Sequence, residues 1–357
     1  MIFAAGLAMA LLNSPQDEIV LKTADSEPRL IVQSDFSALS PPKKSPAYGW
    51  EFPFRSQGFV QLEGERQLRF SVYAQSLDRL PLAQSVCRLL LRLWQISRLQ
   101  FDLDHTELSK REVDIYLSEG GTAGGEQQFV TAYNDDGTSS TKNTIYIYRL
   151  NTFTDPVEML RELAHEYGHA VIPPIGGFKT PEEWGNGYLG EKLFLQTLVS
   201  NAPSGFDWGI EGFGASVGSI SQWLHKFSYS LSNKVWKKGA SRDILIAAGP
   251  KGLGEYQSLM LYAAEAFPSV FGRALKLARG QKAEDALNGV IAAIGEADRL
   301  TVRVPERLGK SAVYLPLRGA WKFVGAVEIA RKRDWIKVQP KSNEFTIVNM
   351  HEQGEDR

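Results

Sequence analysis

Cysteine is almost missing from this sequence. Its 357 residues include one, Cys87, so no disulfide can form within the chain. Cys87 lies in an apolar run with helical periodicity, which is typical of a buried core residue. A single cysteine leaves the redox compartment of the protein open.

Long apolar runs and an excess of one charge are also missing. No segment is long and apolar enough to span a bilayer, so we expect no integral membrane segment. Lys and Arg number 40 and Asp and Glu number 41, and the net charge of −1 gives no argument for nucleic acid or an anionic membrane as a partner. The 43% hydrophobic content allows a substantial core, and the length predicts more than one domain.

The first dozen residues are apolar and rich in alanine, and Ala8-Met9-Ala10 resembles a signal-peptidase site. A positively charged start is lacking, and the apolar run is short. We interpret residues 1–28 as a signal segment followed by a polar linker, which predicts a secreted, periplasmic or cell-surface protein. The alternative is a cytoplasmic protein with a disordered or helical N-terminus.

Histidine is scarce as well, which makes the position of two of the five histidines informative. They belong to a segment that reads His-Glu-x-x-His, namely His165-Glu166-Tyr167-Gly168-His169. The sequence before it predicts a helix, because Asp155 suits the N-cap, Pro156 suits the first helical position and Glu158 can complete a capping box.

On such a helix His165 and His169 lie one above the other on the same face. Two imidazoles placed in this way can bind one zinc ion (Zn²⁺), and Glu166 beside them suits a general base. At these residues the sequence resembles the zincin metallopeptidases. The resemblance covers the motif, the strands before it and the segment after it, about a third of the chain.

The resemblance implies a third zinc ligand after the motif. Residues 170–175 lack the Gly and His that the metzincin branch has there, whereas the gluzincin branch supplies a Glu from a second helix. Glu191 is our choice, because it lies 22 residues after His169 and is a lone acid in an apolar helical run. Glu183 and Glu182 are the rivals. Many gluzincins have an acid one turn after the ligand Glu, where this chain has Leu195.

The function that follows is a zinc-dependent peptidase with a peptide or protein as substrate and no nucleic-acid partner. Related families take an oxyanion donor from the C-terminal half, and His225 is our choice, with Tyr229 and Tyr262 as alternatives. The alternative function is a non-catalytic zincin-like protein that binds peptide or glycan. The cleaved bond, the choice between endopeptidase and exopeptidase, and the oligomeric state stay open.

The remaining pattern predicts an α+β protein. A zincin-like domain over residues 29–299 would contain a mixed sheet and the motif helix, followed by a mainly helical half. Residues 300–350 predict a small all-β module, and residues 351–357 a disordered tail. By resemblance, residues 129–134 form an edge strand that receives the substrate. Residues 120–125 predict a flexible loop, and His105 is expected in a polar loop.

Overall fold

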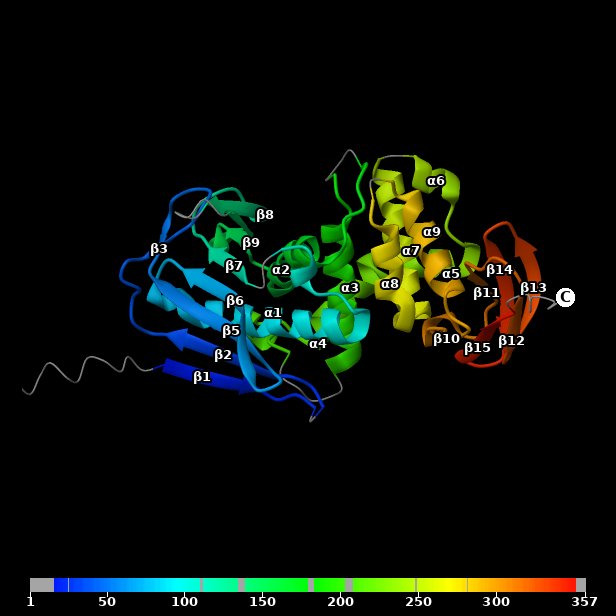
Figure 1. The fold of residues 1–357 in the computed structure, drawn as a ribbon, viewed down its shortest axis with the longest axis horizontal. Helices are drawn as coiled ribbons and strands as arrows, with labels where there is room; N and C mark the ends of the chain where they lie inside the picture. The colour runs from blue at the N-terminus through cyan, green and yellow to red at the C-terminus, as the bar shows by residue number, and fades with distance from the viewer. Residues whose placement is uncertain are drawn as a thin grey trace, which may run out of the picture. The chain divides into compact units, whose positions relative to one another are not determined.

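The computed structural model describes residues 16–24, 26–109, 112–133, 139–178, 183–202, 208–247, 249–280 and 282–350. It is a mixed α/β protein that contains a mixed sheet, a set of helices and a C-terminal all-β module, as predicted (Figure 1). The signal segment predicted over residues 1–12 and the tail over 351–357 lie outside the described residues. Within the described part of the chain, no helix is both long enough and apolar enough to cross a membrane.

The chain divides into two compact units. The first comprises the described residues of Met1–Gln95, His105–Ala170 and Leu198–Ile220. The second comprises those of Ile96–Asp104, Val171–Thr197 and Ser221–Arg357. The sequence had indicated one catalytic domain over residues 29–299, whereas both units contain parts of that range.

A seven-stranded sheet dominates the first unit. The strand order is β1-β2-β5-β6-β7-β9-β8, and all pairs are antiparallel except β6–β7 and β7–β9, which are parallel. Strand β8 therefore forms one edge of the sheet and runs antiparallel to β9. The strands are β1 (Gln16–Leu21), β2 (Arg29–Asp35), β5 (Phe54–Leu62), β6 (Glu65–Ala74), β7 (Val113–Leu117), β8 (Gly124–Tyr133) and β9 (Ser139–Tyr148), and β3 (Lys43–Lys44) and β4 (Glu51–Phe52) form a separate pair.

The two faces of this sheet are covered differently. On one face Phe70 contacts Tyr167 of helix α2 (Pro156–Val171), with 5.9 Å between ring centroids. Helix α1 (Leu80–Phe101) packs on the same face, where Leu91 approaches Gly58 so closely that a Cβ there would lie 3.2 Å from Cγ of Leu91. The other face has a cluster of aromatic residues, Phe52, Tyr73, Tyr116, Tyr146 and Tyr148.

Cys87 of α1 is completely buried, as predicted, and burial raises the pKa of its thiol to about 12. Because the thiol is protonated at neutral pH, Cys87 acts as an apolar core residue rather than as a nucleophile.

Helices make up most of the second unit apart from its C-terminal end. Pro268 is the first residue of α8 and separates it from α7, because proline fits the first turn of a helix but not its interior. Residues 217–238 form two helices, α4 and α5, with Ser228 between them. The helices are α5 (Tyr229–Lys238), α6 (Arg242–Ile246), α7 (Pro250–Ala266), α8 (Pro268–Ala278) and α9 (Glu284–Gly295), and α3 (Asn186–Asn201) and α4 (Val217–Phe227) have residues in both units.

The C-terminal β module consists of two three-stranded antiparallel sheets, β10-β15-β12 and β11-β14-β13. Val302, Ile336, Val338 and Ile347 are buried between the strands. The alternation in the sequence correctly predicted this module. Its strands are β10 (Arg299–Arg303), β11 (Val313–Leu315), β12 (Trp321–Val324), β13 (Ala326–Lys332), β14 (Trp335–Pro340) and β15 (Glu344–Asn349).

Two local predictions were wrong. Residues 16–21, expected in a linker, form β1, because their backbone pairs with β2 in register from Gln16↔Asp35 to Leu21↔Leu30. Gly124 and Gly125, expected in a flexible loop, begin β8 and pair with Tyr148 and Ile147 of β9. In both segments the pairing partner decides the conformation.

Candidate functional site

The helix that contains the His-Glu-x-x-His motif begins as the sequence predicts. Oδ1 of Asp155 accepts a hydrogen bond from the Val157 N–H at 2.8 Å, and Pro156 is the first helical residue. Its C-terminal end is fixed by Asn143 of β9, whose Nδ2 donates to the carbonyl of Ala170 at 3.5 Å. Gln127 of β8 donates in turn to Oδ1 of Asn143 at 2.8 Å. The sheet therefore positions α2 through a buried amide, which the sequence did not reveal.

The two motif histidines face each other. Their Nε2 atoms are 3.2 Å apart, and their ring planes make an angle of 72°. Two nitrogens bound to one tetrahedral zinc ion, each at about 2.05 Å, would lie about 3.3 Å apart. The geometry of His165 and His169 thus fits two ligands of the same zinc ion.

Glu166 lies between the histidines in sequence and is only 3% exposed. Its carboxylate packs against the beginning of the edge strand β8. A Cβ placed on Gly125 would lie 2.8 Å from both Cγ and Oε1 of Glu166, and 2.9 Å from Oε1 of Glu162. Only a glycine at position 125 leaves this space. The cue in the sequence is the glycine-rich stretch over residues 120–125, whose last two residues begin β8 instead of belonging to the expected loop.

The strand predicted to receive the substrate lies at one edge of the seven-stranded sheet. Residues 129–133 belong to β8, the last strand of the sheet, and Asn134 lies outside the described residues. The part of β8 that contacts the motif helix is its start at Gly124 and Gly125. A peptide that paired with the outer edge of β8 would pass this start, beside Glu166.

His105 is not in a polar loop, contrary to our expectation. It is completely buried in a short 3-10 helix, η2 (His105–Glu107), and Nδ1 lies 3.4 Å from Oη of Tyr167. Its ring also packs on Phe70. The packing of the motif helix on the sheet buries this histidine, which explains why local polarity misplaced it.

Glu191 lies on α3, as predicted, and belongs to the second unit. Its side chain is buried, 3% exposed, and Oε1 accepts a hydrogen bond from Nζ of Lys192, which is also buried. Nζ of Lys192 also donates to the Tyr188 carbonyl at 3.3 Å and lies 5.9 Å from the centre of the Trp223 ring. The rival Glu183 is exposed, and Glu182 lies outside the described residues.

The chemistry and spacing of the histidine pair suit two ligands of one zinc ion. Among the residues that the structure describes, no group of three or more His, Cys, Asp or Glu side chains is arranged to hold a metal ion. His165 and His169 supply two donors of suitable spacing. Glu191 stays a prediction as the third ligand.

The three candidates for the oxyanion donor have different surroundings, all in the second unit. His225 is exposed on α4, with Nδ1 2.8 Å from the Ser221 carbonyl and its ring edge-on to Tyr229. Tyr229 is half-buried, and burial raises the pKa of its hydroxyl, although Arg307 opposes the shift. Tyr262 is completely buried and donates to the Tyr314 carbonyl at 2.7 Å. Tyr262 therefore belongs to the core, and His225 and Tyr229 stay candidates.

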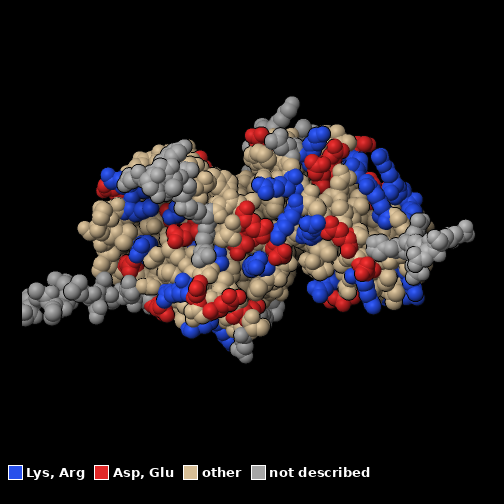
Figure 2. Space-filling view, viewed as in Figure 1, with Lys and Arg blue, Asp and Glu red and all other residues tan. Residues whose placement is uncertain are grey.

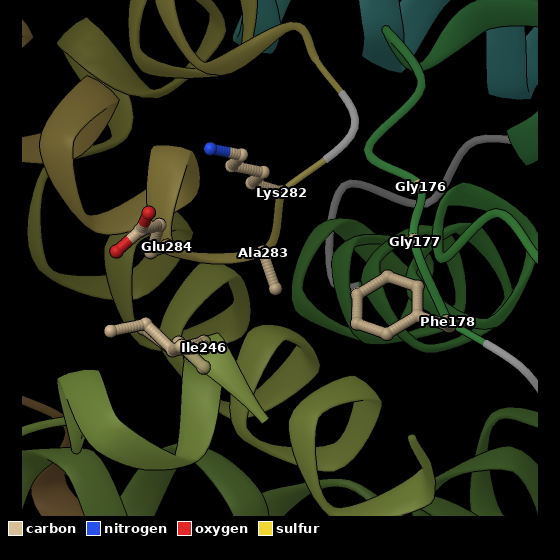
Figure 3. A pocket seen from close by; sticks show the side chains of 8 residues that line it. Gly176, Gly177, Phe178, Ile246, Lys282, Ala283 and Glu284 are labelled. Atoms are coloured by element: carbon tan, nitrogen blue, oxygen red, sulfur yellow. The ribbon is translucent and has the colours of Figure 1, made fainter. Parts of the chain in front are cut away.

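A cavity of about 210 Å³ lies in the second unit, between the segment after the motif helix and the start of α9. Figure 3 shows the Phe178 ring on one side and Ile246, Lys282 and Glu284 on the other. A parallel bridge between Ile175 and Gly280 joins the two segments. None of the predicted site residues lines this cavity.

Comparisons with protein-family models, with curated proteins and with solved structures found no match for this chain.

Proposed function

We propose that this chain is a zinc-dependent peptidase of the gluzincin type that acts on a peptide or protein substrate. The observation that carries the proposal is the 3.2 Å separation between the Nε2 atoms of His165 and His169. Glu166, between them in sequence, is buried against the edge strand. A surface helix with two incidental histidines would leave that carboxylate in water, where its charge is cheapest to keep.

Glu191 is our proposed third ligand. Its support is a buried carboxylate on the helix that follows the motif, at the separation from His169 that the gluzincin resemblance implies. Lys192 bonds Oε1 of Glu191 and would orient the carboxylate as a hydrogen-bonded neighbour of a ligand does in other metal sites.

In the proposed reaction, a bound zinc ion would polarise the scissile carbonyl and lower the pKa of a coordinated water to about 7. Glu166 would take a proton from the attacking water and return it to the leaving amine. Strand β8 would orient the substrate backbone by pairing with it, and His225 or Tyr229 would donate to the developing oxyanion.

The test measures zinc content and peptide hydrolysis together, on the wild type, Glu166→Gln and Glu191→Gln. We expect one zinc ion per chain and peptide cleavage in the wild type. Glu166→Gln should keep the zinc and lose roughly 10²- to 10⁴-fold in kcat/KM, because only the proton acceptor is removed. Glu191→Gln should lose zinc affinity. A wild-type protein without zinc would contradict the proposal.

One observation favours the second candidate, a non-catalytic zincin-like protein that binds peptide or glycan. No group of three or more His, Cys, Asp or Glu side chains arranged to hold a metal ion is present among the described residues. If the wild type holds zinc yet cleaves none of a broad panel of peptides, this second candidate replaces the first.

A further inference from the structure

The C-terminal β module has a strong positive charge that the rest of the chain does not share. Residues 299–349 contain eleven Lys and Arg against four Asp and Glu, a net charge of +7, whereas the whole chain has −1. Figure 2 shows Lys and Arg side chains gathered over this end of the second unit. Repulsion among these like charges destabilises the folded module, and an acidic partner would reduce that repulsion.

Ion pairs within the described residues neutralise only part of this charge. Four arginines have acidic partners: Arg303 pairs with Glu344, Arg307 with Glu265, Arg318 with Asp334 and Arg331 with Glu328. The other seven cations form no ion pair with any described residue. They are Arg299, Lys310, Lys322, Lys332, Arg333, Lys337 and Lys341.

Strand β13 is an edge strand next to these cations. It pairs with β14 alone in the order β11-β14-β13, and every residue after Ala326 is exposed. Val327 and Ile329 are 54% and 52% exposed, and Val324 just before the strand is 48% exposed. An exposed edge with β-branched side chains is a ready template for pairing with another strand.

The charges around β13 select among possible partners. Lys332 and Arg333 lie three and four residues after Ile329 at the end of the strand, and Lys337 lies on the neighbouring strand opposite Ala330. A second copy of the module would bring another charge of +7 and be repelled. The large exposed hydrophobic residues of the module, in its described part, are all aliphatic, so it offers no exposed aromatic platform for nucleobases.

We propose that β13 is a docking edge for an acidic peptide segment of a partner protein, which adds to the sheet as a further strand. Main-chain hydrogen bonds to β13 would supply the affinity. Val327 and Ile329 would contact apolar side chains of the added strand, and Lys332, Arg333 and Lys337 would pair with its carboxylates. The proposal does not depend on peptidase activity.

The experiment uses the full chain with Glu166→Gln, so that no probe is cleaved. Fluorescence anisotropy measures binding of a ten-residue probe peptide in which Glu and Asp alternate with Val and Ile. A second peptide has the same sequence, N-methylated at its four central amides, which removes strand donors and keeps the charge. We expect the methylated peptide to bind at least about tenfold more weakly, and salt to weaken binding of the unmodified one.

Charge reversal tests the cations. The double variant Lys332→Glu/Arg333→Glu should weaken binding by about tenfold or more. The matched control Lys251→Glu/Lys282→Glu makes the same charge change on exposed lysines of α7 and the α9 start, and should stay within about twofold, since neither lysine adjoins β13. Thermal melting of each variant shows whether it is folded.

Three results would overturn the proposal. One is equal binding of the methylated and unmodified peptides, which would mean that charge alone attracts them. Another is no binding of the unmodified peptide at roughly 1 mM. The third is tighter binding of a phosphatidylserine vesicle or a ten-nucleotide oligothymidylate than of the peptide, which would assign the surface to lipid or nucleic acid. The peptide comparison on otherwise unmutated protein holds even if a charge variant fails to fold.

Discussion

Gly125 is the residue whose missing side chain determines where the proposed general base can lie. The Glu166 carboxylate occupies the space that a Cβ at position 125 would fill, and Oε1 of Glu162, one turn earlier on α2, would lie 2.9 Å from the same Cβ. The edge strand and the helix therefore lie close together beside the acid. Burial here excludes water from the carboxylate and holds it in one place, which favours proton transfer in a fixed geometry.

Gly125→Ala is predicted to reduce kcat/KM by about 10²-fold, because a methyl group 2.8 Å from Cγ and Oε1 of Glu166 must displace the carboxylate. Zinc content should stay at the wild-type level, because the substitution removes neither of the proposed ligands His165 and His169. The control is Gly254→Ala on α7, where a Cβ would meet nothing within 4 Å. Full activity in Gly125→Ala would show that Glu166 is not held by this contact.

Polar side chains hold the motif helix α2 at both of its ends. Asp155, the residue just before the helix, caps its N-terminus. Asn143 holds its C-terminus from β9 and is itself completely buried. The second contact fixes His169 with respect to the sheet, because the Ala170 carbonyl follows it directly in the chain.

Asn143→Ala should lower the free energy of unfolding by about 1–3 kcal/mol, since it removes a buried donor to Ala170 and a buried acceptor for Gln127. Zinc affinity should fall with it, as the last turn of α2 loosens. Thr141→Ala on the same strand is the control, because its hydroxyl contact with Thr131 is exposed, and about 0.5 kcal/mol or less is expected. Urea unfolding and zinc titration measure both effects.

The elements that the sequence predicted well are those with local signals. The signals for the N-cap and first proline of α2 and for the alternating strands of the C-terminal module all lie in short stretches of sequence. Strand β1 and the start of β8 could not be found in this way. Their residues become strands because a partner strand supplies the hydrogen bonds, and no local pattern records that partner.

In the candidate site, too, the residues with a local sequence signal could be predicted and those placed by tertiary packing could not. His165, Glu166 and His169 were predictable because four residues on a helix fix their spacing. The burial of His105 against Tyr167, the role of Gly125 and the pairing of Glu191 with Lys192 all arise from tertiary packing. Tyr262 illustrates the limit best: its residue type suited a donor, yet its hydroxyl is bonded to Tyr314 in the core.

At the scale of the whole molecule, the β module is joined to the helices of the second unit by buried polar groups. Oδ1 of Asp334, in the turn before β14, accepts bonds from Arg318 at 2.9 and 2.7 Å, and Oδ2 accepts one from Arg242 of α6 at 3.2 Å. Glu265 of α7 likewise accepts from Arg307 of the module and from Trp236. We therefore expect the module and these helices to unfold together.

Asp334 makes this joint sensitive to acid. Burial alone would raise the pKa of its carboxyl, but Arg318 and Arg242 together hold it below its usual range. A carboxyl whose folded pKa is depressed contributes stability above its unfolded pKa of about 3.9, and this stability is lost as the pH falls through the folded value. The contribution should therefore be complete at pH 7 and decline below about pH 4.

Asp334→Asn is predicted to cost about 2 kcal/mol at pH 7, because it removes charge-assisted bonds to two arginines of separate elements. The difference from wild type should shrink as the pH falls below about 4, where Asp334 of the unfolded chain takes up a proton, and should vanish once the pH has fallen below the lower pKa of the folded carboxyl. Denaturant unfolding at pH 7 and pH 3 measures it. Glu344→Gln, whose pair with Arg303 is exposed, should change stability by less than about 0.5 kcal/mol at either pH. If Asp334→Asn costs the same at both pH values, the charge is not what joins the module to the helices, and packing around Trp335 and Tyr262 does so instead.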